Sequence, residues 1–246
     1  MKVAVTLTIV WLLVSACALG ASIRSHGDKQ AEGEELIRRA KEASDIKSAG
    51  SVPFRLRMRV DTESGEGTFT ETWAGPDKWR EEYASTDFRE TVVGGKDKYW
   101  VVRNTDYEFP LVNTVHQMLG SNFKRVAESS KVKKIRQLKK NGLSLTCVDL
   151  EYGRSMAEQT LCFDHSNNLE VSREVHNLVL IEYSDFMPFA GKLVPRTIRQ
   201  SVGGRLMAEA HVESWQRFQF RRYPCLWRPR ERRNGKPAMT CNRQGH

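Results

Sequence analysis

The sequence predicts an α+β fold: a large curved antiparallel sheet, forming an incomplete β-barrel of about ten strands, with two helices on its concave side. Three observations support this prediction. Short segments of alternating apolar and polar residues follow one another along most of the chain, residues typical of tight turns join them, and helical spacing of apolar residues occurs in two segments. Consecutive strands with short turns form an antiparallel meander and not a parallel α/β sheet.

The first 21 residues have the layout of a secretory signal peptide. Lys2 is followed by an apolar run, Val3–Val14, that is shorter than the roughly 20 residues of a membrane-spanning helix. The letters VSAC at its end match a lipobox, which predicts cleavage before Cys17 and attachment of lipid to that residue. The alternative is ordinary signal cleavage after Gly20 or Ala21, because small residues also precede that point.

The sequence after residue 21 predicts a polar linker over residues 22–30, one domain over residues 31–216 and a basic tail over residues 217–246. No break in composition divides the domain. The net charge of +9 belongs to the ends of the chain, because the tail has nine basic residues against one acidic residue and Lys2 adds one more. The linker and the domain together are formally neutral, so we expect no nucleic acid as a partner.

The expected elements begin with a helix in GEELIRRAKEAS, where Leu36, Ile37, Ala40 and Ala43 share one face. The period then changes to two. FRLRMRVD, which starts at Phe54, alternates apolar with charged residues and predicts a strand with one buried and one solvated face. TFTETW, KWREEY and the two arms of VVGGKDKYWVV continue the strand pattern.

A second helix is expected over residues 110–124, because FPLVNTVHQMLGSNF has apolar residues at helical spacing. Strands return after it. LKKNGLSLTCVDL contains Asn141-Gly142, a dipeptide typical of two-residue hairpins, and further hairpin patterns follow. Cys147 and Cys162 lie in consecutive expected strands of a chain with an export signal, which predicts a disulfide between them; the alternative is two buried thiols that do not meet.

The basic tail has neither strand alternation nor a helical stripe. One interpretation is a disordered basic extension. A second is that the natural reading frame is lost near Trp215, so that the tail is not a selected sequence. A third is a basic and aromatic patch that binds nucleic acid or anionic lipid.

The sequence carries no signature of a catalytic, metal or cofactor site. It lacks GxSxG, HExxH, a phosphate-binding glycine-rich loop and a dinucleotide-binding fingerprint. The cluster from Cys162 to His165 is interpreted as a turn, because Asp and Asn residues there are turn formers. Glu81 and Glu82 are neighbours in an expected strand and point to opposite faces, so we expect both to be solvated. We therefore predict no enzymatic activity, no cofactor and no metal.

The apolar residues of the expected strands and of the second helix support the main functional prediction. A wide curved sheet has more inner surface than two short helices can fill, and Trp, Met and Phe suit a pocket for an irregular apolar ligand. The alternative for each residue is an ordinary packed core. The candidate cavity residues are Leu56, Met58, Val60, Phe69, Trp73, Trp79, Val115, Met118, Leu119, Phe163, Val179 and Ile181.

Four segments, WAGPDKWREEY, TLCFDHSNNLEV, IEYSDFMPFAGKLVPRTIRQ and AEAHVES, resemble the LolA/LolB-like outer-membrane lipoprotein-sorting superfamily. The resemblance covers roughly residues 33–214. It is nearest to the LolA-like domains at the amino end of TonB-family energy transducers.

This resemblance implies an incomplete antiparallel barrel whose apolar cavity receives an acyl chain or a lipoprotein, with residues 110–124 as a lid helix. We expect a monomer in the periplasm. If Cys17 carries lipid, Ala18 in place of an Asp after it implies the outer membrane. The alternative function is an envelope tethering or interaction module that carries no ligand, such as the N-terminal part of a TonB-type transducer.

Overall fold

The computed structural model describes residues 26–47, 51–95, 98–107, 110–119, 130–152, 157–166, 168–174, 178–217, 230–231 and 237–238. Cys17, the rest of the predicted signal peptide and most of the basic tail lie outside these residues. The helices are α2 (His26–Ser44) and α3 (Pro110–Leu119). The strands of the main sheet are β1 (Phe54–Thr62), β2 (Gly65–Gly75), β3 (Lys78–Ser85), β4 (Arg89–Gly94), β5 (Tyr99–Arg103), β6 (Lys131–Lys140), β7 (Leu143–Tyr152), β8 (Ala157–Phe163), β9 (Leu169–Glu174), β10 (Val179–Phe189), β11 (Lys192–Val202) and β12 (Arg205–Arg217), and β13 (Arg230–Glu231) and β14 (Pro237–Ala238) form a separate short ladder.

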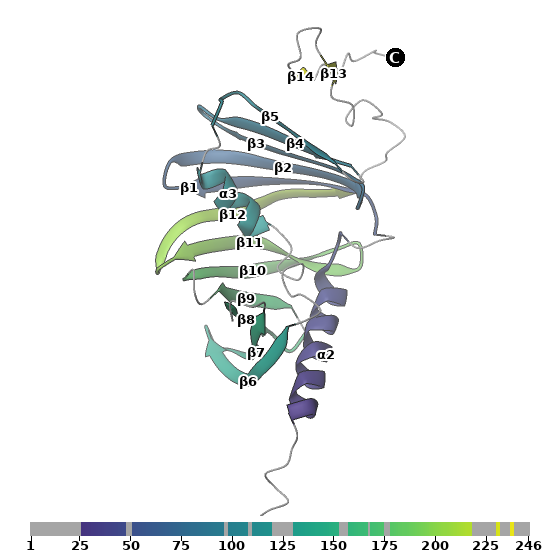
Figure 1. Cartoon of the computed structure of the whole chain (residues 1–246), viewed down its shortest axis with the longest axis vertical. Coiled ribbons are helices and arrows are strands. Elements are labelled where there is room, and N and C mark those ends of the chain that lie inside the picture. Colours follow the sequence, from purple (N-terminus) through teal and green to yellow (C-terminus); the bar gives the residue numbers. More distant parts are fainter. Residues whose placement is uncertain are drawn as a thin grey trace, which may run out of the picture.

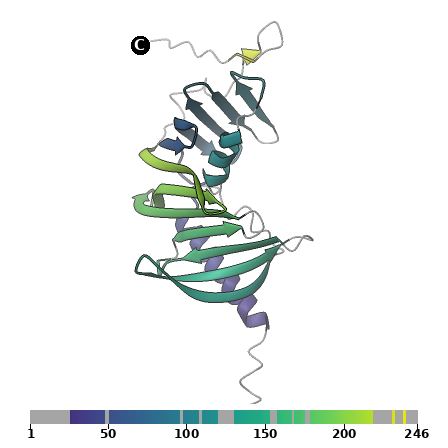
Figure 2. The same ribbon diagram turned by 90° about the vertical axis from the view of Figure 1, so that its left-hand side faces the viewer.

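Twelve strands form one antiparallel sheet in the order β5-β4-β3-β2-β1-β12-β11-β10-β9-β8-β7-β6 (Figure 1). Two meanders make up this order. Strands β1 to β5 run outward to one edge, the chain continues through α3 to the opposite edge, and β6 to β12 return until β12 pairs with β1. The sheet is strongly curved, as Figure 2 shows, and β5 and β6 are its open edges. The predicted fold class is confirmed, with twelve strands in place of about ten.

Three hairpins turn on a pair of residues that both have positive φ, and one of these pairs is Gly203-Gly204 between β11 and β12, with φ values of 58° and 85°. Asn141 and Gly142, between β6 and β7, have φ values of 50° and 82°. Ala190 and Gly191, between β10 and β11, have φ values of 51° and 80°. Positive φ at both central positions gives a two-residue turn the twist that matches the flanking strands. The hairpin predicted at Asn141-Gly142 is confirmed.

One face of the sheet, here called the inner face, holds the main apolar core and carries both helices. On β1, Phe54, Leu56, Met58 and Val60 are buried on this face, and the arginines between them are exposed. Side chains of α2, of α3 and of both meanders join in a single cluster on it. The strict alternation of β1 in the sequence is therefore the alternation between core and solvent.

The first turns of α2 are fastened to the edge strand β6. The side chain of Gln30 donates a hydrogen bond to the carbonyl of Ser130 (3.0 Å) and accepts one from the amide of Val132 (2.8 Å). Gly33 allows the helix to come close, because a Cβ at that position would lie 2.7 Å from Cγ2 of Val132. α2 thus includes residues 26–30, which the sequence predicts as part of the linker. The prediction missed this part because contacts of the polar Gln30 hold it in place, and no apolar stripe marks it as helical.

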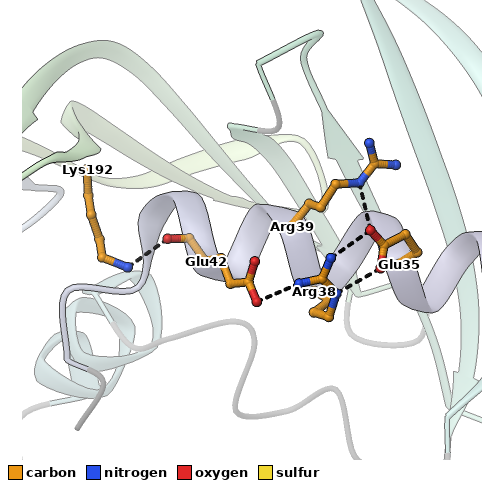
Figure 3. A network of polar contacts seen from close by, with 5 residues as sticks. All are labelled: Glu35, Arg38, Arg39, Glu42 and Lys192. Atoms are coloured by element: carbon orange, nitrogen blue, oxygen red, sulfur yellow. Dashed lines mark hydrogen bonds and ion pairs between the residues drawn. The ribbon is translucent and has the colours of Figure 1, made fainter. Parts of the chain in front are cut away.

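The other end of α2 is tied to the start of β11. Nζ of Lys192 donates to the backbone carbonyl of Glu42 at 2.7 Å, and Figure 3 shows this contact beside the ion pairs of Arg38 with Glu35 and Glu42. Those ion pairs are exposed to solvent, so they contribute little to the stability of the fold. No helix within the described residues has the length and apolarity needed to span a bilayer.

A smaller apolar cluster lies on the opposite, outer face of β7 to β9. Leu145, Cys147, Cys162 and Val171 are buried there. Cys147 and Cys162 face each other in the β7–β8 ladder with their Cα atoms 4.0 Å apart, and a disulfide joins them. This is the cysteine pair named from the sequence, and it links two strands that are already neighbours.

Candidate ligand site on the inner face

All but one of the predicted cavity residues have described side chains, and these belong to one cluster on the inner face. The cluster draws on both meanders and on α3, so residues far apart in the sequence meet there. Leu119 is the last residue of α3, and its side chain is the one that the structure does not describe. The buried members are Leu56, Met58, Val60, Phe69, Trp73, Val115, Met118, Phe163 and Ile181, and Trp79 and Val179 are partly buried against them.

These side chains pack against one another as the residues of a core do. A hollow of about 490 Å³ lies elsewhere, on β6 to β8, and charged residues such as Lys133, Arg136 and Asp149 line it. Arg136 is opposite Cys147 in the β6–β7 ladder, so this hollow opens on the outer face. An apolar cavity on the inner face therefore stays a prediction.

Aromatic side chains form a row along one end of the inner face, here called the aromatic row. Phe54, Trp73 and Trp79 are opposite one another on β1, β2 and β3, and the ring centroids of Phe54 and Trp73 are 5.6 Å apart. The ring centroids of Phe54 and Trp215 of β12 are 5.2 Å apart, and those of Trp215 and Phe189 of β10 are 5.1 Å apart. The row therefore spans the junction of the two meanders.

Trp79 is a partly buried member of the aromatic row. Its indole rests against Gly94 of β4, where a Cβ would lie 2.0 Å from the ring, so only glycine leaves room for it. Tyr99 is opposite Gly94 on the edge strand β5 and is 70% exposed. Exposure along the inner face thus rises from the fully buried Phe54 through the partly buried Trp79 to the exposed Tyr99 on the edge strand.

An ionic cluster lies beside the aromatic row on β2 to β5. His116 of α3 holds one part of it: Nδ1 lies 3.1 Å from Oε2 of Glu81, and Nε2 lies 3.1 Å from Oε1 of Glu90. Glu90 is almost fully buried and also pairs with Arg103 of β5. The members of the ionic cluster are Lys47, Glu71, Glu81, Glu90, Arg103 and His116.

Opposing effects set the charge of His116. Burial alone lowers its pKa, but the hydrogen bonds and negative charges of Glu81 and Glu90 outweigh burial and raise the pKa above the ordinary value. A protonated His116 donates to both carboxylates at once. The charged ring therefore fastens α3 to β3 and β4.

Lys47 forms the second part of the ionic cluster. Its Nζ lies 2.7 Å from Oε1 of Glu71, whose side chain is 3% exposed. Burial works against the charge of Lys47, but Glu71 and then Glu81 overcome it and raise the pKa of this lysine. The segment that follows α2 is thereby held against β2.

The sequence prediction for Glu81 is wrong. Glu81 contacts His116 and is mostly buried, whereas Glu82 points to the other face and pairs with Arg80 at 2.6 Å. The alternation of faces was predicted correctly, but the sequence did not show that α3 covers one of them. Glu71, Glu90, Phe189 and Trp215 are also absent from the predicted site, because their positions depend on strand register and strand order.

In chemical terms the site offers an apolar surface with an aromatic end, and paired charges that position the elements above it. Among the described residues, no group of three or more His, Cys, Asp or Glu side chains is placed to hold a metal ion. Each carboxylate of the ionic cluster faces a cation. The arrangement is suited to holding α3 and the segment after α2 over the sheet.

Comparison with known proteins gives matches only at the level of structure. No family model matches the sequence, and no curated protein matches it. A LolA superfamily protein from Nitrosomonas europaea is similar over 76% of this chain and 94% of its own, with 11% identity and a TM-score of 0.46. A DUF1329 family protein from Desulfovibrio piger is similar over 76% of this chain and 92% of its own, with 7% identity and a TM-score of 0.43.

A third similar structure is MucB in complex with MucA, with 11% identity over 76% of this chain and 56% of that one, and a TM-score of 0.30. The first of the three structures belongs to the superfamily that the sequence motifs resemble.

Proposed function

We propose that this chain is a non-enzymatic carrier domain that binds an acyl chain, free or attached to a lipoprotein, against the inner face of its open sheet. The observation that supports the proposal most directly is the inner face, which is apolar and rich in Trp, Phe and Met across both meanders. Flexible and aromatic side chains adapt to irregular apolar ligands. The motifs that resemble the LolA/LolB-like superfamily favour the same function.

α3 is the element whose displacement would uncover this face. Val112, Val115 and Met118 insert from α3 into the inner cluster. The helix has 10 residues, and a helix of this length is not stable in water without such contacts. An acyl chain in the place of these side chains gains about 0.8 kcal/mol for each buried methylene, so a chain of roughly ten methylenes can compensate for the displaced helix.

Binding of an acyl chain is tested at Trp79. We expect Trp79→Ala to weaken binding of a fluorescent fatty acid about tenfold, because the ligand loses most of the burial that one large side chain provides. The measurements are titration with that fatty acid and native mass spectrometry of the chain purified from cells, which should show co-purified lipid.

Trp100→Ala is the matched control, because Trp100 is exposed and is one position from Tyr99, so it points to the other face of β5. We expect it to leave binding unchanged. Fatty acid binding that is absent from the unsubstituted chain, or that falls equally in both variants, would contradict the proposal.

We also propose that the chain is exported to the periplasm and that Cys17 is acylated and anchors it to the outer membrane. The lipobox letters VSAC and the Ala18 that follows them support this. Cells fed a labelled fatty acid should incorporate label into the chain, and Cys17→Ser should abolish the incorporation. Label retained in that variant would place the modification elsewhere.

The close packing of the inner cluster favours a second candidate, an interaction module that carries no ligand. Leu56, Met58 and Phe69 already fill the space around them. On this candidate the chain purified from cells contains no lipid and takes up none, while both Trp79→Ala and Trp100→Ala leave a protein partner bound. The same titration therefore separates the two candidates.

A further inference from the structure

We propose that β6, one open edge of the sheet, docks the protein onto a bilayer surface with anionic headgroups. β6 reads KVKKIRQLKK, which has six cations and no acid in 10 residues. Residues 22–216, which include this strand, are formally neutral as a whole, so this edge is a local concentration of positive charge. The proposal concerns a surface distinct from the inner face and does not require a ligand there.

Three of these cations have no partner among the residues that the structure describes. Lys131, Lys134 and Lys139 are exposed, and in the described part of the chain no hydrogen bond or ion pair engages their ammonium groups. Neighbouring acids instead pair with the remaining cations. Lys133 pairs with Glu151 and Glu158, Arg136 with Asp149, and Lys140 with Glu182.

These three lysines lie on both faces of the edge strand. Lys134 is opposite Asp149 and shares the outer face with Arg136, whereas Lys139 is opposite Ser144, next to the outer-face Leu138, and so lies on the inner side. A partner that contacts either face alone would meet only part of this charge. A partner that lies against the edge itself meets all of it.

The edge is arranged against the addition of another strand. Gln30 occupies the outward amide of Val132 and the carbonyl of Ser130, and the β6–β7 register shifts between Val132 and Lys134. Caps and bulges of this kind are how edge strands avoid pairing with other chains. The charges of Lys131, Lys134 and Lys139 are therefore suited to binding an anionic surface, and an extended acidic peptide that pairs as an added strand is disfavoured.

The predicted lipid anchor leads to the same edge. Gln30 attaches the first turns of α2 to β6, and both views place these elements at the same end of the molecule (Figures 1 and 2). Cys17 precedes His26 by nine residues, which span at most about 30 Å. An acylated Cys17 therefore holds β6 close to the bilayer, and stable membrane association takes two such signals together.

The test compares binding to phosphatidylcholine vesicles with and without phosphatidylglycerol, by co-sedimentation at low salt. We expect the chain to prefer the anionic vesicles. We expect the triple variant K131Q/K134Q/K139Q to bind them about 100-fold more weakly, because each lysine near an anionic surface raises the binding constant about fivefold. The matched control R55Q/R89Q/K98Q removes three exposed cations from the other meander and should keep the binding of the unsubstituted chain.

Three results would overturn the proposal: equal binding by the triple variant and the unsubstituted chain, an equal loss in the control variant, or no preference for anionic vesicles. Soluble polyglutamate provides the alternative partner. If the triple variant loses polyglutamate binding while vesicle binding is unaffected, the edge recognises an acidic polypeptide. Fatty acid titration of the same preparations reports separately on the inner face, so failure of one proposal does not imply failure of the other.

Discussion

His116 joins α3 to two strands through both nitrogens of its ring. Because its pKa is raised in the folded chain, the folded state binds a proton more tightly than the unfolded state does. Glu81, Glu90 and the nearby cations Lys47 and Arg103 are the charged groups around it. The stabilisation is therefore complete below the ordinary pKa of about 6.5 and is lost as the pH rises through the raised pKa.

We expect the free energy of unfolding to fall between pH 6 and pH 9 and this fall to be smaller in His116→Gln. The substitution itself should cost about 1–3 kcal/mol at pH 6, because the buried Glu90 loses a hydrogen-bond partner. Urea unfolding at the two pH values measures both effects. His165→Gln, in an exposed turn, should keep the pH dependence of the unsubstituted chain, and an identical pH dependence in His116→Gln would contradict the role given to this residue.

Single residues of the inner face were predictable where polarity alternates along a strand. Leu56, Met58 and Phe69 follow from that pattern, because burial of one face is a local property of the sequence. Glu71 and Glu90 are buried on the same face and break the pattern. Their burial depends on cations from other elements, which no local pattern reports.

At the scale of elements, the hairpin between β10 and β11 contains a strained residue. Ala190 has a φ of 51°, and this conformation costs a residue with a Cβ about 1–2 kcal/mol. We expect Ala190→Gly to raise the free energy of unfolding by about 0.5–1 kcal/mol, after the added freedom of the unfolded chain is taken into account. Thermal or urea unfolding measures the change.

Gly191→Ala is the opposite control in the same turn. Gly191 has a φ of 80°, so an added Cβ should lower the free energy of unfolding by about 1 kcal/mol. A stabilising Gly191→Ala or a destabilising Ala190→Gly would mean that this turn does not hold the described conformation. The Asn141-Gly142 hairpin was predictable from its dipeptide, but Ala190 carries no such signal.

Helix boundaries were predictable only where an apolar stripe marks them. The stripe from Leu36 to Ala43 predicts the second half of α2, and Gln30 and Gly33 secure the first half through contacts with β6. α3 ends at Leu119, and residues 120–124 of the expected helix lie outside the described residues. Contacts with a distant strand therefore determine where α2 begins, which the apolar periodicity of the sequence does not show.

At the scale of the whole molecule, the sequence predicts antiparallel meanders but not how they meet. Short turns specify that β1 to β5 and β6 to β12 pair with their sequence neighbours. The β1–β12 pairing joins residues as far apart as Phe54 and Arg217, and only the shared inner core selects it. The aromatic row crosses this junction, which is why Phe189 and Trp215 could not be assigned to it from the sequence.

The place of β12 beside β1 has a consequence for how the protein is made. One side of β1 has no partner until β12 has been synthesised, because β12 is the strand that pairs with it. Until then the first meander lacks both this strand partner and the part of the inner core that the second meander supplies. Closure of the sheet therefore cannot precede synthesis of β12, and a product that stops short of β12 leaves one hydrogen-bonding edge of β1 unpaired.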